Sequence, residues 1–205
     1  MSSILVGRTR ARSQAIQLIF QAEIQGVDVF DLLERGEYAL DDGPLDDYAA
    51  ELARGVATNR IAIDRLIGSL SHNWNLSRMP LVDRAVMSIS IFEVMCEDDV
   101  PQSVAISEAV ELSKVYGTDD SSAFVNGILG RVSVLTRANP ELSLAQLASL
   151  AASGELEDAE AAQGAEADPE AGEQADLPAE GEGQPVETCA GQVPAEEETA
   201  DGASR

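Results

Sequence analysis

Three arginines, Arg8, Arg10 and Arg12, stand at alternate positions near the start of the chain, and no acidic residue precedes Glu23. A guanidinium group offers a rigid fork of donors that matches phosphate oxygens. Placed at the start of a helix, these side chains can gather phosphates, which gives affinity for nucleic acid without choosing a sequence. A basic terminus with no partner is the alternative, because three arginines make a small patch.

Other residues that often do chemistry lack the partners such chemistry needs. Glu108 and Glu111 form a carboxylate pair on one predicted helix, but no metal-ligand pattern or glycine-rich phosphate loop accompanies them. A solvated face, or a salt bridge with Lys114, is therefore expected. His72 and Trp74 stand at a predicted helix junction, where a packing tryptophan is the default.

The two cysteines, Cys96 and Cys189, form neither a metal-binding pattern nor a redox pair. Both are predicted to be free thiols in a reducing compartment. No run of roughly 18 apolar residues occurs, and the first residues lack the apolar segment of a signal peptide, so neither membrane insertion nor export is indicated. The sequence thus predicts a cytoplasmic protein without a metal or a cofactor.

The formal net charge of -24 is distributed unevenly. Residues 1–150 carry 12 Lys or Arg and 21 Asp or Glu, whereas residues 151–205 carry one Arg and 16 acidic residues. From Ser153 onward the chain is mostly Glu, Ala, Gly and Pro, and it cannot bury enough apolar surface to offset the entropy of ordering. We therefore predict one domain over residues 1–140 and an acidic low-complexity tail over residues 141–205, mostly disordered.

The domain is predicted to be all-α. Apolar residues recur at helical spacing over residues 9–25, 45–70, from Pro80 onward, 103–117 and 119–137. The stretch after Pro80 is apolar on nearly every face, which is typical of a central buried helix. Candidate N-caps are Ser103 and either Asp120 or Ser121, and Gly117 is a candidate stop.

Four stretches of the sequence resemble the NusB family of transcription antitermination factors. They are "ARSQAIQLIF", "GVATNRIAIDRLI", "VDRAVMSISIFEVM" and "DVPQSVAISEAVELSKVYGTDDSSAFVNGIL", and they span roughly residues 8–135 in the family's order. The resemblance implies a helical bundle of two packed subdomains, over residues 8–70 and 76–136. It also implies binding of boxA, a single-stranded RNA element, together with ribosomal protein S10. The pair would join RNA polymerase and other Nus factors to suppress premature termination, chiefly in ribosomal RNA operons.

The resemblance also implies where these partners bind. The loop and helix start "YGTDDSSAF" would lie near the arginines, so that unpaired bases could stack and form hydrogen bonds there. The expected RNA-binding residues are Arg8, Arg10, Arg12, Gln14, Tyr116, Thr118, Asp120, Ser121, Ser122 and Phe124. For Phe124 a core position is the alternative, and for Asp120 a helix cap. S10 is expected at Asp83 and Arg84, with acidic residues nearby that could attract a basic protein, namely Glu93, Glu97, Asp98 and Asp99.

The chain departs from the family pattern at three positions. Ser107 replaces an amide residue, Ala123 a basic residue and Gly130 an aspartate, and Arg131 could supply the missing cation. An enzyme is not expected, because the RNA methyltransferases that carry a similar domain would need a cofactor-binding domain after residue 140. The alternative function is a helical protein-docking scaffold with little RNA contact. The tail either competes with RNA for the arginines or only solubilises the protein.

Overall fold

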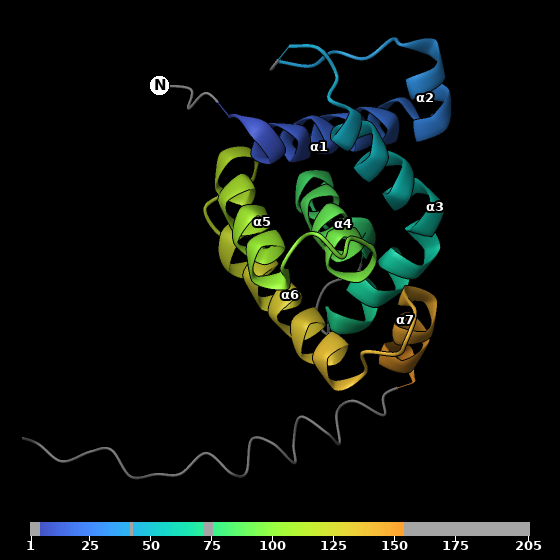
Figure 1. Cartoon of the computed structure of the whole chain (residues 1–205), viewed down its shortest axis with the longest axis vertical. Coiled ribbons are helices and arrows are strands. Elements are labelled where there is room, and N and C mark those ends of the chain that lie inside the picture. Colours follow the sequence, from blue (N-terminus) through green and yellow to red (C-terminus); the bar gives the residue numbers. More distant parts are fainter. Residues whose placement is uncertain (1–4, 42, 72–75, 154–205) are drawn as a thin grey trace, which may run out of the picture. The chain divides into compact units, whose positions relative to one another are not determined.

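The computed structural model describes residues 5–41, 43–71 and 76–153. These residues form seven α-helices and one short 3-10 turn, without a strand among them, which confirms the all-α prediction (Figure 1). The elements are α1 (Gly7–Gln25), α2 (Val29–Arg35), α3 (Asp47–Leu70), η1 (Leu76–Arg78), α4 (Leu81–Cys96), α5 (Gln102–Tyr116), α6 (Ser121–Ala138) and α7 (Leu144–Ala152). None of the helices described is long and apolar enough to cross a membrane. The acidic tail from residue 154, with Cys189, and the pair His72 and Trp74 lie outside the described residues.

The helix ends follow the local sequence closely. Gly26 ends α1 in the left-handed conformation with φ 65°, which glycine adopts without strain. Asp46 caps α3 by accepting a hydrogen bond from the Tyr48 amide at 3.0 Å. The prediction of Ser103 as an N-cap was wrong, because α5 begins directly after Pro101, where a proline loses no helical hydrogen bond.

The helices form two packed halves, with α4 at the centre (Figure 1). In one half α1 and α2 lie against α3, and in the other α5 lies against α6. Helix α4 contacts α1, α3, α5 and α6, and each of its residues from Ala85 to Glu93 is buried. This confirms the predicted central helix, which needs apolar residues on nearly every face.

The first half continues beyond the predicted domain boundary at residue 140. Ser143 and Gln146 form a reciprocal capping box, which starts α7. Helix α7 packs on α3 and buries Leu144, Leu147 and Ala148. The boundary was placed too early, because a short apolar helix here directly precedes a long acidic segment, and composition alone merges the two.

Helices α3 and α4 cross closely at a glycine. A Cβ atom added to Gly55 would overlap the ring of Phe92, which is only 8% exposed. The missing side chain thus lets the ring lie against the α3 backbone. Because protein interiors are close-packed, this contact fixes how near the two helices can lie.

The segment of residues 37–46 is bound to α1 by a glutamine ladder, which we define as Gln14, Gln17 and Gln21. Gln14 accepts a hydrogen bond from the Asp46 amide at 2.9 Å and donates one to the Pro44 carbonyl at 2.9 Å. Gln17 accepts from the Asp41 amide at 3.1 Å, and Gln21 accepts from the Ala39 amide at 3.1 Å. The side chains of α1 therefore satisfy backbone groups of residues that lie outside the helices, namely Ala39, Asp41, Pro44 and Asp46.

Candidate nucleic-acid interface

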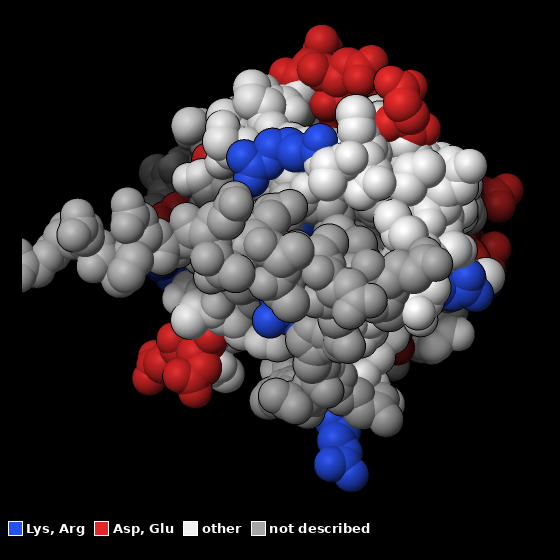
Figure 2. Space-filling model, turned by 90° about the horizontal axis from the view of Figure 1, so that it is seen from below, with Lys and Arg blue, Asp and Glu red and all other residues white. Residues whose placement is uncertain are grey.

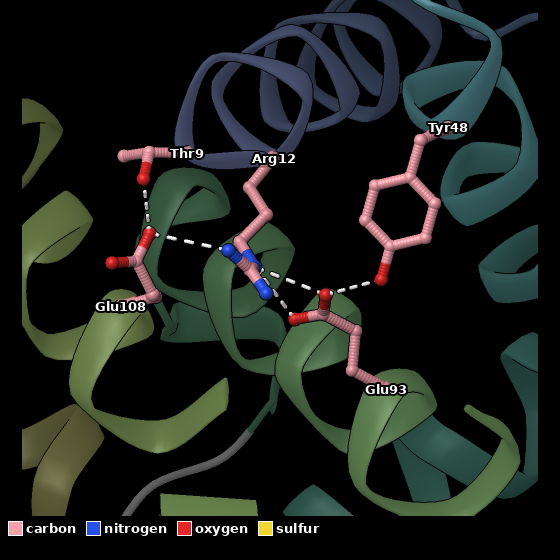
Figure 3. A network of polar contacts seen from close by, with 5 residues as sticks. All are labelled: Thr9, Arg12, Tyr48, Glu93 and Glu108. Carbon is pink, nitrogen blue, oxygen red and sulfur yellow. Dashed lines mark hydrogen bonds and ion pairs between the residues drawn. The ribbon is translucent and has the colours of Figure 1, made fainter. Parts of the chain in front are cut away.

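The first turns of α1 are joined to three other helices by a polar network (Figure 3). Arg12 Nε donates to both carboxylate oxygens of Glu93 at 2.9 Å, and Arg12 Nη1 donates to Glu108 Oε2 at 3.2 Å. Glu93 Oε1 also accepts from the Tyr48 hydroxyl at 2.6 Å, and Glu108 Oε2 accepts from the Thr9 hydroxyl at 2.6 Å. The network therefore connects α1 with α3, α4 and α5.

Burial and charge together set the protonation of this network. Burial alone would lower the pKa of Arg12, but the hydrogen bond and the charge of Glu93, with the charge of Glu108, outweigh it and raise that pKa. The pKa of Tyr48 is raised above its ordinary value, first by burial and then by the hydrogen bond to Glu93. At neutral pH Arg12 is therefore charged and Tyr48 is a hydrogen-bond donor.

Three of the residues predicted to bind RNA are buried instead. Arg12 is 3% exposed, and its guanidinium group is occupied by Glu93 and Glu108. Gln14 is fully buried in the glutamine ladder. Ser121 is 1% exposed, where its hydroxyl donates to Asp83 Oδ2 at 3.0 Å and accepts from the Thr118 amide. These three side chains were predicted to contact RNA directly. In the structure they are buried and bonded to other residues, so they do not lie on the surface.

The other two arginines remain near the surface and point towards α3. The Arg10 side chain is 33% exposed, and its Nη2 donates to Asp46 Oδ2 at 3.2 Å. Its Nε is buried without a hydrogen-bond partner among the described residues. Arg8 is exposed, and its guanidinium carbon lies 5.0 Å from the centre of the Tyr48 ring. Of the three arginines, Arg8 and Arg10 therefore keep their side chains near the surface, whereas Arg12 does not.

The second part of the predicted surface is anchored on α1 further along the helix. The Tyr116 hydroxyl shares a hydrogen bond with Ser13 at 2.6 Å and accepts one from Gln17 at 3.3 Å. Of the remaining predicted residues, Thr118 and Asp120 are exposed, Ser122 is half-buried, and Phe124 is half-buried against the core. Both parts of the predicted surface thus contact α1, but Arg8 and Arg10 are held towards α3, whereas Tyr116 reaches α1 from the end of α5.

The opposite end of the molecule offers no comparable basic surface in what can be seen of it. Figure 2 views that end, and on the part left uncovered the Lys and Arg side chains are scattered rather than gathered. Arg131, considered as a replacement for the missing cation, donates from Nη1 to the Leu70 carbonyl at 2.7 Å. It therefore connects α6 to the end of α3. Ser107 and Gly130 line an open groove of about 730 Å³ between α5 and α6.

The expected partner-binding residues differ in accessibility. Asp83 is 3% exposed, and its Oδ1 is buried without a hydrogen-bond partner among the described residues. Burial raises the pKa of Asp83, and the hydrogen bond from Ser121 offsets only part of this rise. Glu93 is fully buried as well. The prediction that Asp83 and Glu93 lie on the partner-binding surface was therefore wrong, because both belong to the core. Asp98 and Asp99 are exposed, as the predicted acidic surface requires.

Arg84 belongs to an ion-pair ring, which we define as Glu23, Arg60, Asp64 and Arg84. Arg84 bonds Glu23 at 3.1 Å and Asp64 at 3.3 Å, and Arg60 pairs with the same two carboxylates. These four residues line a cavity of about 190 Å³ between α1, α3 and α4, together with apolar side chains such as Ile19. The ring thus places two acidic and two basic side chains in the lining of this cavity.

Sequence reasoning missed Tyr48, Thr9 and the core role of Glu93. Glu93 interrupts the apolar run "ISIFEVM", and a carboxylate within a buried helix requires a cation nearby. That pattern indicated a buried ion pair, although it did not indicate which arginine takes part. Nothing local distinguishes Tyr48, whose partners Arg8 and Glu93 are distant in sequence.

Comparison with known proteins places the chain in one family. A sequence model of the NusB family matches residues 9–134, more than half of the chain. Among curated relatives named transcription antitermination protein NusB, that of Nocardioides sp. (strain ATCC BAA-499 / JS614) is 43% identical over 136 residues, which cover 66% of this chain and 98% of the relative. That of Saccharopolyspora erythraea is 42% identical over 142 residues, which cover 65% of this chain and 96% of the relative.

Solved structures agree with this assignment. NusB of T. maritima superposes with a TM-score of 0.55 at 36% identity, covering 63% of this chain and 92% of the other. A structure titled antitermination factors NusB and NusE in complex with dsRNA shares the fold, with a TM-score of 0.50 at 20% identity over 61% of this chain and 94% of the other. The chain therefore belongs to the NusB family of transcription antitermination proteins.

Proposed function

We propose that this protein binds boxA-type single-stranded RNA together with ribosomal protein S10. The pair then joins RNA polymerase and other Nus factors in the cytoplasm and suppresses premature termination, chiefly in ribosomal RNA operons. The observation that carries this proposal is the match along 96–98% of the length of curated relatives named for antitermination. The NusB structure solved with NusE, which is S10, and double-stranded RNA supports RNA and S10 as the classes of partner.

On the RNA side, the proposed contacts are narrower than the sequence suggested. Arg8 and Arg10 supply cations from the first turn of α1, and Arg10 can exchange its bond with Asp46 for one with a phosphate. Tyr116, Thr118, Asp120, Ser122 and Phe124 supply stacking and hydrogen-bonding groups. The proposed contact residues are supported by three buried side chains beneath the surface, those of Arg12, Gln14 and Ser121.

On the S10 side, we propose that the partner covers the ion-pair ring and the apolar residues beside it. Phe20 and Ile24 lie one turn apart on α1 and are 36% and 63% exposed. Glu23, between them in sequence, pairs with Arg84. An apolar patch with a polar rim is the usual anatomy of a protein interface. We therefore propose that Arg84 contacts S10 directly. Asp83 is buried and contributes only indirectly, because it accepts a hydrogen bond from Ser121 at the start of α6.

The same apolar residues favour the second candidate, a docking scaffold that hardly touches RNA. Phe30 on α2 is also 46% exposed, so α1 and α2 both present apolar side chains to solvent. Under this alternative the exposed arginines have no RNA partner. The two candidates differ in salt dependence, because phosphate contacts lose affinity steeply as salt rises.

The test is fluorescence anisotropy with three labelled RNAs, namely a boxA-type strand, the same strand scrambled, and a duplex, each with and without S10. We expect the boxA strand to bind most tightly and S10 to increase its affinity. Arg10→Ala should flatten the slope of log K against log salt by about 0.7, the value for one single-strand phosphate contact. Absence of binding to all three RNAs, with S10 still bound in a titration, would leave the docking scaffold as the function.

A further inference from the structure

Arg8 and Tyr48 form a stacked pair at the edge of the candidate interface. The guanidinium carbon lies 5.0 Å from the ring centre, within the usual range of a cation–π contact. Arg8 is exposed and forms no salt bridge with any residue that the structure describes. The guanidinium group therefore lies over the ring while the Arg8 side chain remains accessible to solvent.

Tyr48, which lies beneath Arg8, is held through its backbone amide and through its hydroxyl group. The Tyr48 amide donates to the Asp46 side chain at 3.0 Å, and the Tyr48 hydroxyl donates to Glu93 at 2.6 Å. Glu93 is itself fixed by Arg12 in the buried core (Figure 3). Because the ring cannot turn freely, it restricts the orientations of a long and otherwise mobile arginine side chain.

The charges around Arg8 disfavour a phosphate as its partner. The pKa of Glu97 is raised overall, first by burial and then by the charges of Glu51 and Glu93. The positive charge of Arg8 opposes this rise, so Arg8 lies close enough to Glu97 to act on it. Arg8 thus lies within the electrostatic reach of a group of carboxylates. These would repel a phosphate, whereas a base carries no charge and its amino groups could donate to carboxylate oxygens.

We infer that Arg8 and Tyr48 form a platform on which one unpaired base of the bound RNA stacks, with Tyr48 as the positioning residue. Guanidinium planes are common stacking surfaces for unpaired bases. The inference rests on the proposed RNA-binding function and specifies the chemistry of one of its contacts. It gives Arg8 a different role from Arg10, although the two are close in sequence.

The experiment measures the affinity of a boxA-type strand for the full-length protein and its variants. Arg8→Ala and Tyr48→Leu should each weaken binding by about tenfold, within the usual effect of removing a stacking side chain. The double variant should bind no more weakly than either single variant, because both remove the same contact. Tyr48→Phe keeps the ring and should stay within about threefold of the wild type. Arg8→Lys keeps the charge but loses the plane, and should resemble Arg8→Ala.

A set of strands with one abasic position each gives a readout that a purely structural role would not change. At the nucleotide on the platform, loss of the base should weaken binding to the wild type but not to Arg8→Ala or Tyr48→Leu. At every other position the loss should be the same for all proteins. Arg65→Ala is the matched control, because Arg65 is an exposed arginine towards the other end of α3.

Three outcomes would overturn the platform. Full retention of affinity by Arg8→Lys would make Arg8 a phosphate contact. Additive losses in the double variant, or equal abasic profiles for the wild type and Arg8→Ala, would mean that no base stacks there. The Arg8 variants decide the matter even if Tyr48→Leu fails to fold, since Arg8 is exposed. A wild type that binds no RNA would overturn the proposed function itself, whereas the other outcomes would leave it intact.

Discussion

Arg12 and Glu93, which lie 81 positions apart in the chain, form a buried ion pair in which one nitrogen donates to both carboxylate oxygens. Their side chains are 4% and 1% exposed. A buried charge is tolerated only when it is paired and hydrogen-bonded. Each residue therefore neutralises the buried charge of the other, and the pair fixes α1 against α4.

Removing either partner should destabilise the fold strongly. We expect Arg12→Ala and Glu93→Ala each to lower the free energy of unfolding by about 3–5 kcal/mol, because each leaves an uncompensated buried charge. The double variant should cost less than the sum of the two. Urea unfolding of the full-length protein measures these values. As a control, Lys114→Ala breaks the exposed pair with Glu111 and should cost less than about 1 kcal/mol. Additive losses in the double variant would contradict the coupling.

Asp83 should make stability depend on acid pH in an unusual direction. Its folded pKa is raised above the ordinary 3.8, so the folded state holds the proton more tightly than the unfolded state. The contribution of Asp83 is then most favourable below pH 3.8 and is lost as pH rises through the folded pKa. Asp83→Asn should remove this dependence and be at least as stable as the wild type at neutral pH.

A charge reversal at the same position should act in the opposite direction. Asp83→Lys places an unpaired cation where the carboxylate is 3% exposed, and should destabilise the domain by about 3 kcal/mol or more. Thermal unfolding between pH 3 and pH 8 compares the three proteins. A folded Asp83→Lys variant of normal stability would show that the carboxylate reaches the surface in solution.

The close crossing of α3 and α4 predicts opposite effects for two glycines of one helix. Gly55→Ala should lower the free energy of unfolding by about 1–3 kcal/mol, because the added methyl group overlaps the Phe92 ring. Gly68→Ala has open space and should stabilise the protein by roughly 0.5–1 kcal/mol through helix propensity. Chemical unfolding measures both. Phe92→Leu should recover part of the loss in the Gly55→Ala background, and equal stability of the two single variants would refute the packing argument.

The acidic tail carries a prediction from charge alone. Its 16 acidic residues can compete with RNA for Arg10, because tethering gives an effective concentration on the order of millimolar. Deleting residues 154–205 should then tighten binding of unrelated RNA most at low salt, with the gain shrinking as salt screens the charges. Equal affinities of both proteins at every salt concentration would leave solubility as the role of the tail.

Most of the fold could be predicted because helix-forming patterns are local. Apolar spacing over residues 9–25 and 45–70 predicted α1 and α3 well, since periodicity acts over a few residues. The burial of Arg12 could not be predicted in this way, because Glu93 and Glu108 are distant in sequence. The same reason explains the errors at Gln14, Asp83 and Ser121, because each of these side chains forms a hydrogen bond with a residue far along the chain.

The glutamine ladder has a consequence for how the length of the chain can change. Gln14 and Gln21 are seven residues apart on α1, and the amides that they accept from, those of Asp46 and Ala39, are also seven apart. Surface connections usually tolerate inserted or deleted residues. An extra residue between Ala39 and Asp46 would have to be accommodated between two amides that are each bonded to α1. We therefore expect insertions to be tolerated better before residue 37, outside the glutamine ladder.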